Sequence, residues 1–357
     1  MEAVTDSKRP CEKPALTSFN LDSLADQLQQ AGFKRYRAAQ VMEWFYGKKV
    51  QNFSEMKNIS SPVAEWLAEN FNIFSSSLVA AHDSGDGAVK LEIALRDRQT
   101  VEAVLMEAPR RVTVCLSCQV GCPLGCAFCA TGAGGFARNL ASAEIIEQVL
   151  HAQSLMDDQK HISNLVFMGM GEPCLNIDAV FDAIRILNAS YAFNIGARRI
   201  TISTLGDPRC IESIAAYPYE VGLAISLHAG NDALRRKLIP KAPASIAETV
   251  DAGWNYFRTT GREVTYEYVL LAGVNDSPQD AARLGTLLKD RRAFVNLIPY
   301  NEVEGLPFKR PTARKTAGFQ RSLVSRGVKA HVRRSLGRNV HAACGQLRLS
   351  QSPERLK

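Results

Sequence analysis

Residues 122–129 read Cys-Pro-Leu-Gly-Cys-Ala-Phe-Cys, so Cys122, Cys126 and Cys129 follow a Cys-x-x-x-Cys-x-x-Cys spacing. A 4Fe-4S cluster normally takes four cysteine ligands. Three ligands leave one iron free to bind a molecule other than protein, as the open position does in a catalytic zinc site. The spacing predicts a metal cluster that takes part in chemistry.

A structural zinc site is the alternative interpretation of these cysteines. Its fourth ligand would come from Cys115, Cys118 or a distant His. Zinc ligands usually form short pairs separated by about a dozen or more residues, whereas all three cysteines lie here in one loop. Cys115 and Cys118 could also form a redox pair, but residues 112–120 are typical of a buried strand. We therefore interpret Cys118 as a small core thiol and favour the cluster over zinc.

The chain as a whole has the composition of a globular protein. Its 357 residues are long for one core and indicate a large domain with an accessory one. Nine cysteines, an odd number, and an N-terminus without an apolar signal segment argue for a reducing cytoplasm rather than a disulfide framework. No stretch reaches membrane-spanning length.

Basic residues are concentrated near the C-terminus. Residues 309–357 contain thirteen Lys or Arg and a single acid, Glu354, so the net charge of this segment is +12. The net charge of the whole chain is +7, so the other residues sum to −5. Apolar residues are threaded through it: Phe319 and Leu323 indicate a helix ending near Gly327, and residues 328–332 alternate as in a strand. A folded basic segment beside an acidic remainder favours an RNA or DNA partner over a solvated tail.

The rest of the chain divides into two patterns. Apolar residues at helical spacing between Leu21 and Leu67 predict a small N-terminal helical module, followed by a turn at Asp83–Gly87 and paired strands at Lys90–Ala94 and Thr100–Met106. Beyond Arg111, apolar strand-like runs alternate with helix-length segments such as Ser142–Leu155 and Ile177–Leu187. The predicted strands are Val112–Leu116, Asn164–Met168, Arg199–Ser203, Val221–Ser226, Val264–Leu270 and Phe294–Ile298.

Such alternation predicts an α/β fold with a parallel sheet, open or closed into a full or partial barrel. We expect four units: an accessory domain at 1–88, a linking hairpin at 89–110, the barrel at 111–308 and a basic segment at 309–357. Polar residues follow the predicted strands, where barrel active sites are built. They are the cysteine loop, Gly169-Met-Gly-Glu172, Ser203-Thr204, Ser226-Leu227-His228 and Asn301.

Cys344 lies far from the cluster motif, in Ala-Ala-Cys-Gly-Gln-Leu. Its small neighbours leave the sulfur accessible, and Arg334, Arg338 and His341 add positive charge. A thiol in such surroundings is more nucleophilic. A buried C-terminal thiol is the commoner case, but this context favours a reactive one.

Seven segments, taken together, strongly resemble the RlmN/Cfr family of radical S-adenosylmethionine RNA methyltransferases. The resemblance runs in register from about Asp22 to Leu347. The segments are Cys115-Leu-Ser-Cys-Gln-Val-Gly-Cys-Pro-Leu-Gly-Cys-Ala-Phe-Cys-Ala-Thr-Gly, Phe167-Met-Gly-Met-Gly-Glu-Pro, Thr201-Ile-Ser-Thr, Ile225-Ser-Leu-His, Gly273-Val-Asn-Asp-Ser, Asn296-Leu-Ile-Pro-Tyr-Asn and Ala342-Ala-Cys-Gly-Gln-Leu.

The resemblance implies a fold, cofactors and site residues. The fold is a partial barrel of six strand–helix units behind a small helical domain, and Cys122, Cys126 and Cys129 bind a 4Fe-4S cluster whose open iron chelates S-adenosylmethionine. Seven positions match residues that hold this cofactor: Gly171, Glu172, Ser203, Ser226, Leu227, His228 and Asn301. Cys344 matches the methyl-carrying cysteine, Cys115 its resolving partner, and Glu102 the residue described as proton acceptor.

The implied reaction explains this equipment. Carbon 2 of adenine is electron-poor, so simple displacement of a methyl group from a sulfonium cannot modify it, whereas a radical can. One S-adenosylmethionine methylates Cys344 and a second yields the radical that activates this methyl group for addition to the base. Proton loss and attack by Cys115 on the Cys344 sulfur then release the product and leave a disulfide.

The chain departs from the family at two places. Acidic residues common before Ala-Ala-Cys are replaced by residues 337–341, Gly-Arg-Asn-Val-His, and Lys241-Ala242 replaces the usual Ile-Asn. The first change makes the Cys344 loop more cationic. The second lies near the expected cofactor strand.

We therefore expect a cytoplasmic, monomeric enzyme that methylates adenine C2 in 23S rRNA, with tRNA as an additional candidate substrate and an electron donor such as a flavodoxin. Methylation of carbon 8 is the near alternative. From a different class, an RNA-binding protein with a structural metal site is the other alternative. Formation of 5′-deoxyadenosine separates an enzyme from a binding protein.

Overall fold

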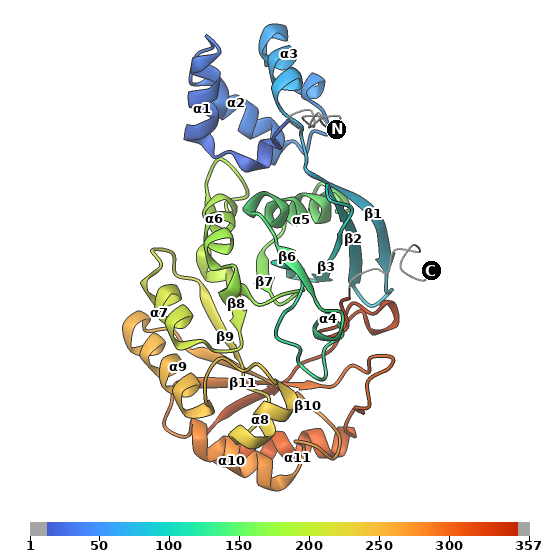
Figure 1. Ribbon diagram of the computed structural model, residues 1–357, viewed down its shortest axis with the longest axis vertical. Helices are drawn as coiled ribbons and strands as arrows, with labels where there is room; N and C mark the ends of the chain where they lie inside the picture. Colours follow the sequence, from blue (N-terminus) through green and yellow to red (C-terminus); the bar gives the residue numbers. More distant parts are fainter. Residues whose placement is uncertain (1–12, 349–357) are drawn as a thin grey trace, which may run out of the picture.

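The computed structural model describes residues 13–348. Its main element is a ten-stranded sheet in the order β1-β2-β3-β4-β7-β8-β9-β10-β11-β12 (Figure 1). The strands are β1 (Ser76–Asp83), β2 (Ala88–Leu95), β3 (Thr100–Ala108), β4 (Arg111–Cys115), β7 (Asn164–Phe167), β8 (Ile200–Thr204), β9 (Gly222–Ser226), β10 (Val264–Leu270), β11 (Ala293–Pro299) and β12 (Lys329–Val332). A separate pair consists of β5 (Gln119–Gly121) and β6 (Phe136–Asn139).

The sheet is parallel from β4 to β12 and antiparallel from β1 to β4. The six predicted barrel strands are confirmed as β4, β7, β8, β9, β10 and β11; the bounds of β10 agree with the prediction, and the ends of the others differ by at most one residue. Because β1 and β12 lie at opposite ends of this order, the sheet does not close on itself. The fold is thus the expected partial barrel with a mostly parallel sheet.

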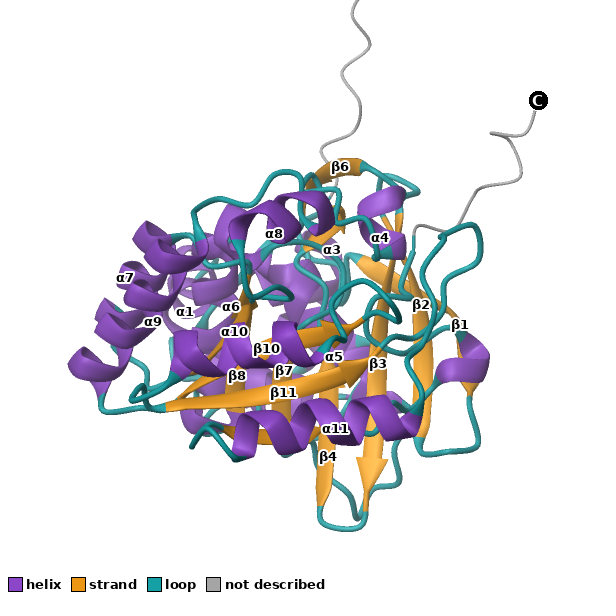
Figure 2. Cartoon of the chain, turned by 90° about the horizontal axis from the view of Figure 1, so that it is seen from below, coloured by secondary structure: helices purple, strands orange, loops and turns teal. Residues whose placement is uncertain are grey.

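Helices cover the outside of the sheet (Figure 2). They are α5 (Ser142–Ser154), α6 (Ile177–Asn188), α7 (Pro208–Ala216), α9 (Ile246–Thr260), α10 (Pro278–Leu288) and α11 (Ala313–Val324). Two short helices, α4 (Ala130–Ala133) and α8 (Asp232–Leu238), lie at the cysteine loop instead. The longer ones begin with defined caps, as where Ser245 accepts from the Glu248 N–H at the start of α9. Their amphipathic faces meet the valine, isoleucine and leucine side chains of the strands in one core.

The N-terminal helices α1 (Leu21–Gln30), α2 (Arg37–Met42) and α3 (Ser61–Asn70) stand at one end of the barrel, above α5 and α6 in Figure 1. A buried carboxylate fastens this module to the barrel. Glu147 on α5 accepts hydrogen bonds from the Thr17 hydroxyl at 2.6 Å and the Ser75 N–H at 2.8 Å. A buried carboxylate needs such partners, because desolvation raises its pKa and favours its neutral form.

Two stretches extend the sheet beyond the predicted barrel segment. The paired strands expected at Lys90–Ala94 and Thr100–Met106 are confirmed as β2 and β3, while β1 lies inside residues 1–88 and was not predicted. The helix and strand expected after Lys309 are confirmed as α11 and β12. Residues 1–12 and 349–357 of the expected terminal units, with Glu354, lie outside the described residues.

After β12 the chain returns to the opposite end of the sheet. The Gly337 N–H donates to both carboxylate oxygens of Asp86 at 3.0 Å, and the Asn339 side chain donates to the Ser84 carbonyl at 2.9 Å. Ser84 and Asp86 lie in the turn between β1 and β2. The last segment therefore runs from one sheet edge to the other (Figure 1), and Cys344 on it lines the barrel interior.

Candidate active site

The three motif cysteines line one cavity of about 160 Å³. The loop that carries them is held by backbone hydrogen bonds from Cys122 to the Gly135 carbonyl at 2.7 Å and from Ala127 to the Leu238 carbonyl at 2.9 Å. All three thiols are partly exposed, and burial raises the pKa of Cys122 to about 11. An apolar cavity that disfavours free thiolates suits a group that replaces their protons with metal.

The donor set fits an iron–sulfur cluster. The motif supplies three cysteine sulfurs from one loop, and cysteine thiolate is the usual ligand of iron in such a cluster; the fourth cysteine of the lining, Cys344, comes from the returning C-terminal segment. Within residues 13–348, no group of three His, Cys, Asp or Glu side chains is arranged to hold a single metal ion. Cluster ligands each bind a different iron, so they do not have to converge on one point. Cluster binding by Cys122, Cys126 and Cys129 stays a prediction.

Gly171 and Glu172 follow β7 and line the same cavity. Gly171 has a φ of +103°, and a Cβ there would lie 2.6 Å from the Gln119 side chain, so only glycine lets the chain pass. The Glu172 carboxylate accepts from the Leu205 N–H at 3.0 Å and the Cys174 N–H at 3.2 Å. Burial raises the pKa of Glu172 to about 7.

This raised pKa predicts a pH effect on the stability of the cofactor-free protein. Glu172 binds its proton more tightly in the folded protein than in the unfolded chain, where its pKa is 4.5. Its contribution to the free energy of unfolding is therefore complete below about pH 4.5 and is lost as the pH rises through about 7, by about 3 kcal/mol. Urea unfolding of wild type and Glu172→Gln across this range should show their difference changing by that amount. A constant difference would contradict the assignment.

Ser203, Ser226 and His228 complete the cavity wall from the ends of β8 and β9. The Val269 N–H donates to Nδ1 of His228 at 3.0 Å, so the neutral ring carries its proton on Nε2. Burial and the nearby Arg235 lower the pKa of His228 to about 3, which keeps the ring neutral. His228 can thus donate one hydrogen bond to a ligand.

Two other predicted cofactor residues lie apart from this wall. Leu227 is fully buried, with its N–H bonded to the Glu267 carbonyl at 3.0 Å. Asn301 faces a second cavity, where its amide donates to the Cys344 carbonyl at 3.2 Å and its oxygen accepts from Arg310 at 3.1 Å. The structure thereby connects Asn301 with the loop that carries Cys344.

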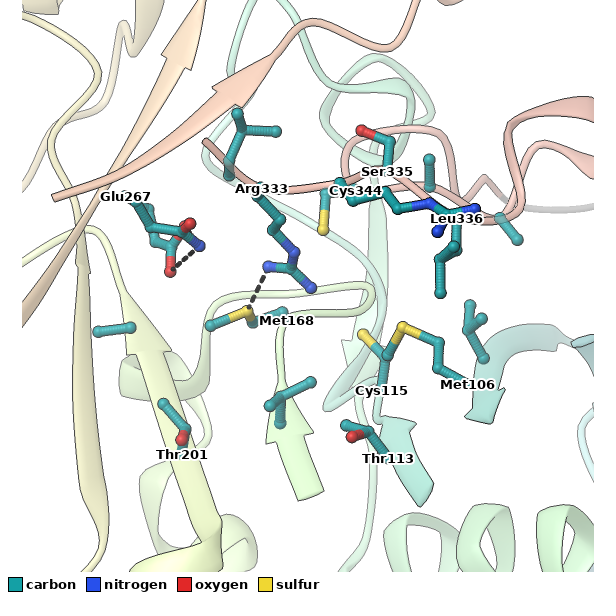
Figure 3. A pocket seen from close by; sticks show the side chains of 18 of the residues that line it. Met106, Thr113, Cys115, Met168, Thr201, Glu267, Arg333, Ser335, Leu336 and Cys344 are labelled. Carbon is teal, nitrogen blue, oxygen red and sulfur yellow. Dashed lines mark hydrogen bonds between the residues drawn. The ribbon is translucent and has the colours of Figure 1, made fainter. Parts of the chain in front are cut away.

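The second cavity, of about 420 Å³, is the interior of the partial barrel. Cys115 at the end of β4 and Cys344 on the returning segment both line it, and Figure 3 shows their sulfurs facing one space. Cys344 also lines the first cavity, that of the three motif cysteines, which we call the cluster cavity. Met168, Glu267 and Arg333 likewise line both cavities. A group on Cys344 is therefore exposed to both cavities at once.

Arg333 is the functional candidate that sequence reasoning missed. Its guanidinium donates to the Met168 sulfur at 3.6 Å and lies beside Glu267 (Figure 3). Burial raises the pKa of Cys115 to about 12, an effect that Cys344 increases and Arg333 opposes. Arg333 follows β12 directly, so the rule that polar residues cluster at strand ends could have identified it. Arg334, Arg338 and His341 are the positive charges that the sequence predicts near Cys344, and Arg333 is not among them.

Glu102, the residue expected to accept a proton, lies outside both of these cavities. Its carboxylate pairs with Lys90 Nζ at 2.8 Å and accepts from the Arg348 N–H at 2.8 Å. It lines a third cavity with these residues, and neither of the two cavities described above. The structure does not bring Glu102 to the two thiols.

The remaining expectations concern single residues. Cys118 is buried, as expected for a core thiol. At the second departure from the family, Lys241 Nζ donates to the Pro123 carbonyl inside the cysteine loop at 2.7 Å.

Cys115 and Cys344 are free thiols, whereas Cys174 and Cys210 form a disulfide that the sequence did not indicate. No helix within residues 13–348 has the length and apolar character needed to cross a bilayer.

Comparisons with known proteins agree with this geometry. Residues 116–285 match the model of the radical SAM superfamily, and residues 15–73 match that of the ribosomal RNA large subunit methyltransferase N-terminal domain. A probable dual-specificity RNA methyltransferase RlmN of Thermotoga maritima is 43% identical over 95% of this chain and 99% of the relative. One of Rhodopirellula baltica is 40% identical over 94% and 91%. The crystal structure of a radical SAM methyltransferase from Sphaerobacter thermophilus superimposes with a TM-score of 0.91 at 41% identity, covering 94% of this chain and 99% of that one.

Proposed function

Because this chain belongs to the RlmN family of radical SAM RNA methyltransferases, we propose that it methylates carbon 2 of adenine in 23S rRNA, and in tRNA, by way of S-methylated Cys344. One observation carries the proposal: Cys344 lines both the cavity of the cluster cysteines and the barrel interior that holds Cys115. A methyl carrier needs access to the cofactor on one side and to the base and the resolving thiol on the other.

The cofactors follow from the family and from the donor set. A 4Fe-4S cluster on Cys122, Cys126 and Cys129 and S-adenosylmethionine, two molecules per turnover, supply radical hydrogen abstraction when bound. Gly171, Glu172, Ser203, Ser226 and His228 would hold S-adenosylmethionine, since their backbone and side chains open on that cavity. We also propose Leu227 and Asn301 as contacts of S-adenosylmethionine, but only because they match cofactor-binding positions of the family.

Five of the chain's own residues then have separate tasks. Cys344 carries the methyl group, and Asn301 fixes the backbone of its loop. Arg333 favours the thiolate form of Cys115, which has to attack the Cys344 sulfur. The attack forms an S–S bond between Cys115 and Cys344 and breaks the bond between the Cys344 sulfur and the methylene carbon attached to the base. The electron pair of that bond goes to the base, and a proton added to the methylene carbon completes the methyl group. Glu102 is proposed as the acceptor of the carbon 2 proton on the resemblance alone.

We also propose the binding partners of the protein. The basic segment that begins at Lys309 would bind RNA phosphates, and its return to the turn at Asp86 places it at the barrel, where an unstacked base would enter. We propose a monomer in the cytoplasm that receives electrons from a protein such as a flavodoxin.

Mass spectrometry of nucleosides tests this function. rRNA and tRNA from cells with and without the protein should differ in 2-methyladenosine. A difference in 8-methyladenosine alone would instead establish carbon 8 as the target. No difference in either nucleoside, with no 5′-deoxyadenosine formed by the reduced protein, would indicate an RNA-binding protein with a structural metal site.

A further inference from the structure

The Cys174–Cys210 disulfide lies beside the cluster cavity, and the proposed reaction does not use it. Cys174 belongs to the short helix Pro173–Leu175, which follows β7 and Glu172. Cys210 lies in the first turn of α7, after β8 and Ser203. The bond therefore joins the loops that follow two neighbouring parallel strands.

Both loops supply walls of the cluster cavity. The first contributes Gly171 and Glu172, and the second contributes Leu205, two residues beyond Ser203 of β8, which lines the same cavity. One buried carboxylate links the two loops, because Glu172 accepts from the Leu205 N–H of one loop and from the Cys174 N–H of the other. The disulfide thus fastens the two loops at the point where the buried Glu172 is held.

The position of the pair makes its sulfurs chemically available. Cys174 is partly exposed, and its sulfur lies 3.0 Å from the Thr204 hydroxyl oxygen, whereas Cys210 is 8% exposed. A small thiol can reach the Cys174 sulfur, and Cys210 would be the leaving group. In a reducing compartment such as the one proposed above, disulfides are usually transient.

We propose that Cys174 and Cys210 are a redox-responsive modification site, at which a thiol–disulfide switch fastens or releases the two loops of the S-adenosylmethionine site. On oxidation, the two thiols lose two protons and two electrons to a low-molecular-weight disulfide such as glutathione disulfide, which becomes two thiols. Reduction by two equivalents of glutathione reverses the exchange. The oxidised state holds Glu172 in place before the cofactor binds, which increases the affinity for it.

The identity of the cofactor in this inference rests on the proposed function, so its test has two readouts. The cluster-loaded, full-length protein is equilibrated anaerobically in glutathione buffers of graded redox ratio, quenched with acid, alkylated and digested. Peptide mass spectrometry should show Cys174 and Cys210 passing from dithiol to disulfide within that range. Hydrogen–deuterium exchange of residues 169–176 and 203–210 should slow in the oxidised state by roughly 10-fold or more.

S-adenosylmethionine is the probe for the second readout. Its dissociation constant should be about 3- to 10-fold lower for the oxidised protein, as expected when a loop is ordered before binding. Cys210→Ala should remove both redox effects. Cys118→Ala, which removes a buried free thiol outside the pair, is the matched control and should keep both.

Three results would overturn the switch. They are a pair that stays oxidised in the most reducing buffer, a pair that never oxidises, and loops whose exchange rates are the same in both states. Failure of the proposed function looks different: the switch would still cycle and alter loop exchange, but S-adenosylmethionine would bind neither state. Equal cofactor affinity in the two states, with redox-dependent exchange, would contradict the link to the cofactor.

Discussion

Substitution of Cys344 by alanine should abolish methylated RNA while the iron and sulfide content of the protein stays near that of wild type. Cys344 is the only free thiol in residues 13–348 that lines both cavities, so no other sulfur can take over as carrier. We expect product formation to fall by at least about 10³-fold, because the covalent route is lost entirely. Nucleoside mass spectrometry and iron analysis of the same samples measure the two effects.

Cys118→Ala is the control for this variant. Cys118 is buried in the core, and its replacement should cost about 1 kcal/mol of stability and leave methylation largely intact. Loss of the cluster in Cys344→Ala would mean that its ligands have been misassigned. Methylation at the wild-type rate would remove Cys344 from the reaction.

Substitution of Cys115 by alanine should block a later step and leave RNA attached to the protein. Among residues 13–348, Cys115 is the only thiol besides Cys344 that lines the barrel interior, so without it no described thiol can attack the Cys344 sulfur and free the modified base. We expect about one methyl group transferred per protein molecule, with the RNA retained as a covalent adduct. Denaturing electrophoresis with labelled RNA detects the adduct, and nuclease digestion followed by peptide mass spectrometry locates it.

The double variant Cys115→Ala/Cys344→Ala is the control for the adduct. It should form none, because the carrier is absent. An adduct in the double variant would place the RNA on another residue. Multiple turnover by Cys115→Ala would show that another thiol resolves the intermediate.

The order of the strands and the place of the cavity followed from local patterns. Most predicted strands from Val112 to Ile298 are short, largely apolar runs that end at or just before polar residues. A helix-length segment between two such strands favours a right-handed crossover that makes them parallel neighbours. The carboxyl ends of parallel strands meet at one edge. The cysteine loop, Glu172, Ser203 and Ser226 were therefore predictable neighbours, and they line one cavity.

Contacts made by the chain ends were harder to predict. β1 was missed because its alternation, Ser76 to Asp83, exposes most of its side chains and carries a weak apolar signal. The approach of Cys344 to the barrel depends on the hydrogen bonds from Gly337 to Asp86, which join residues 251 positions apart. Local sequence contains no information on such a contact.

Disulfide pairing was beyond sequence reasoning for a similar reason. Cys174 and Cys210 are 36 residues apart, and only the adjacency of β7 and β8 brings their loops together. An odd number of cysteines and a cluster motif argued for free thiols throughout. Glu102 shows the opposite case, because a motif match gave it a role while its side chain pairs with Lys90 outside both cavities.

Methylation of Cys344 is the central claim, and one measurement tests it most directly. The cluster-loaded protein is incubated anaerobically with S-adenosylmethionine labelled with deuterium in its methyl group, without RNA, and the peptide carrying Cys344 is analysed by mass spectrometry. The account predicts a labelled methyl group on the Cys344 sulfur, which passes to the RNA when RNA and a reductant are added. An unmodified Cys344, in protein that methylates RNA at the normal rate, would contradict it.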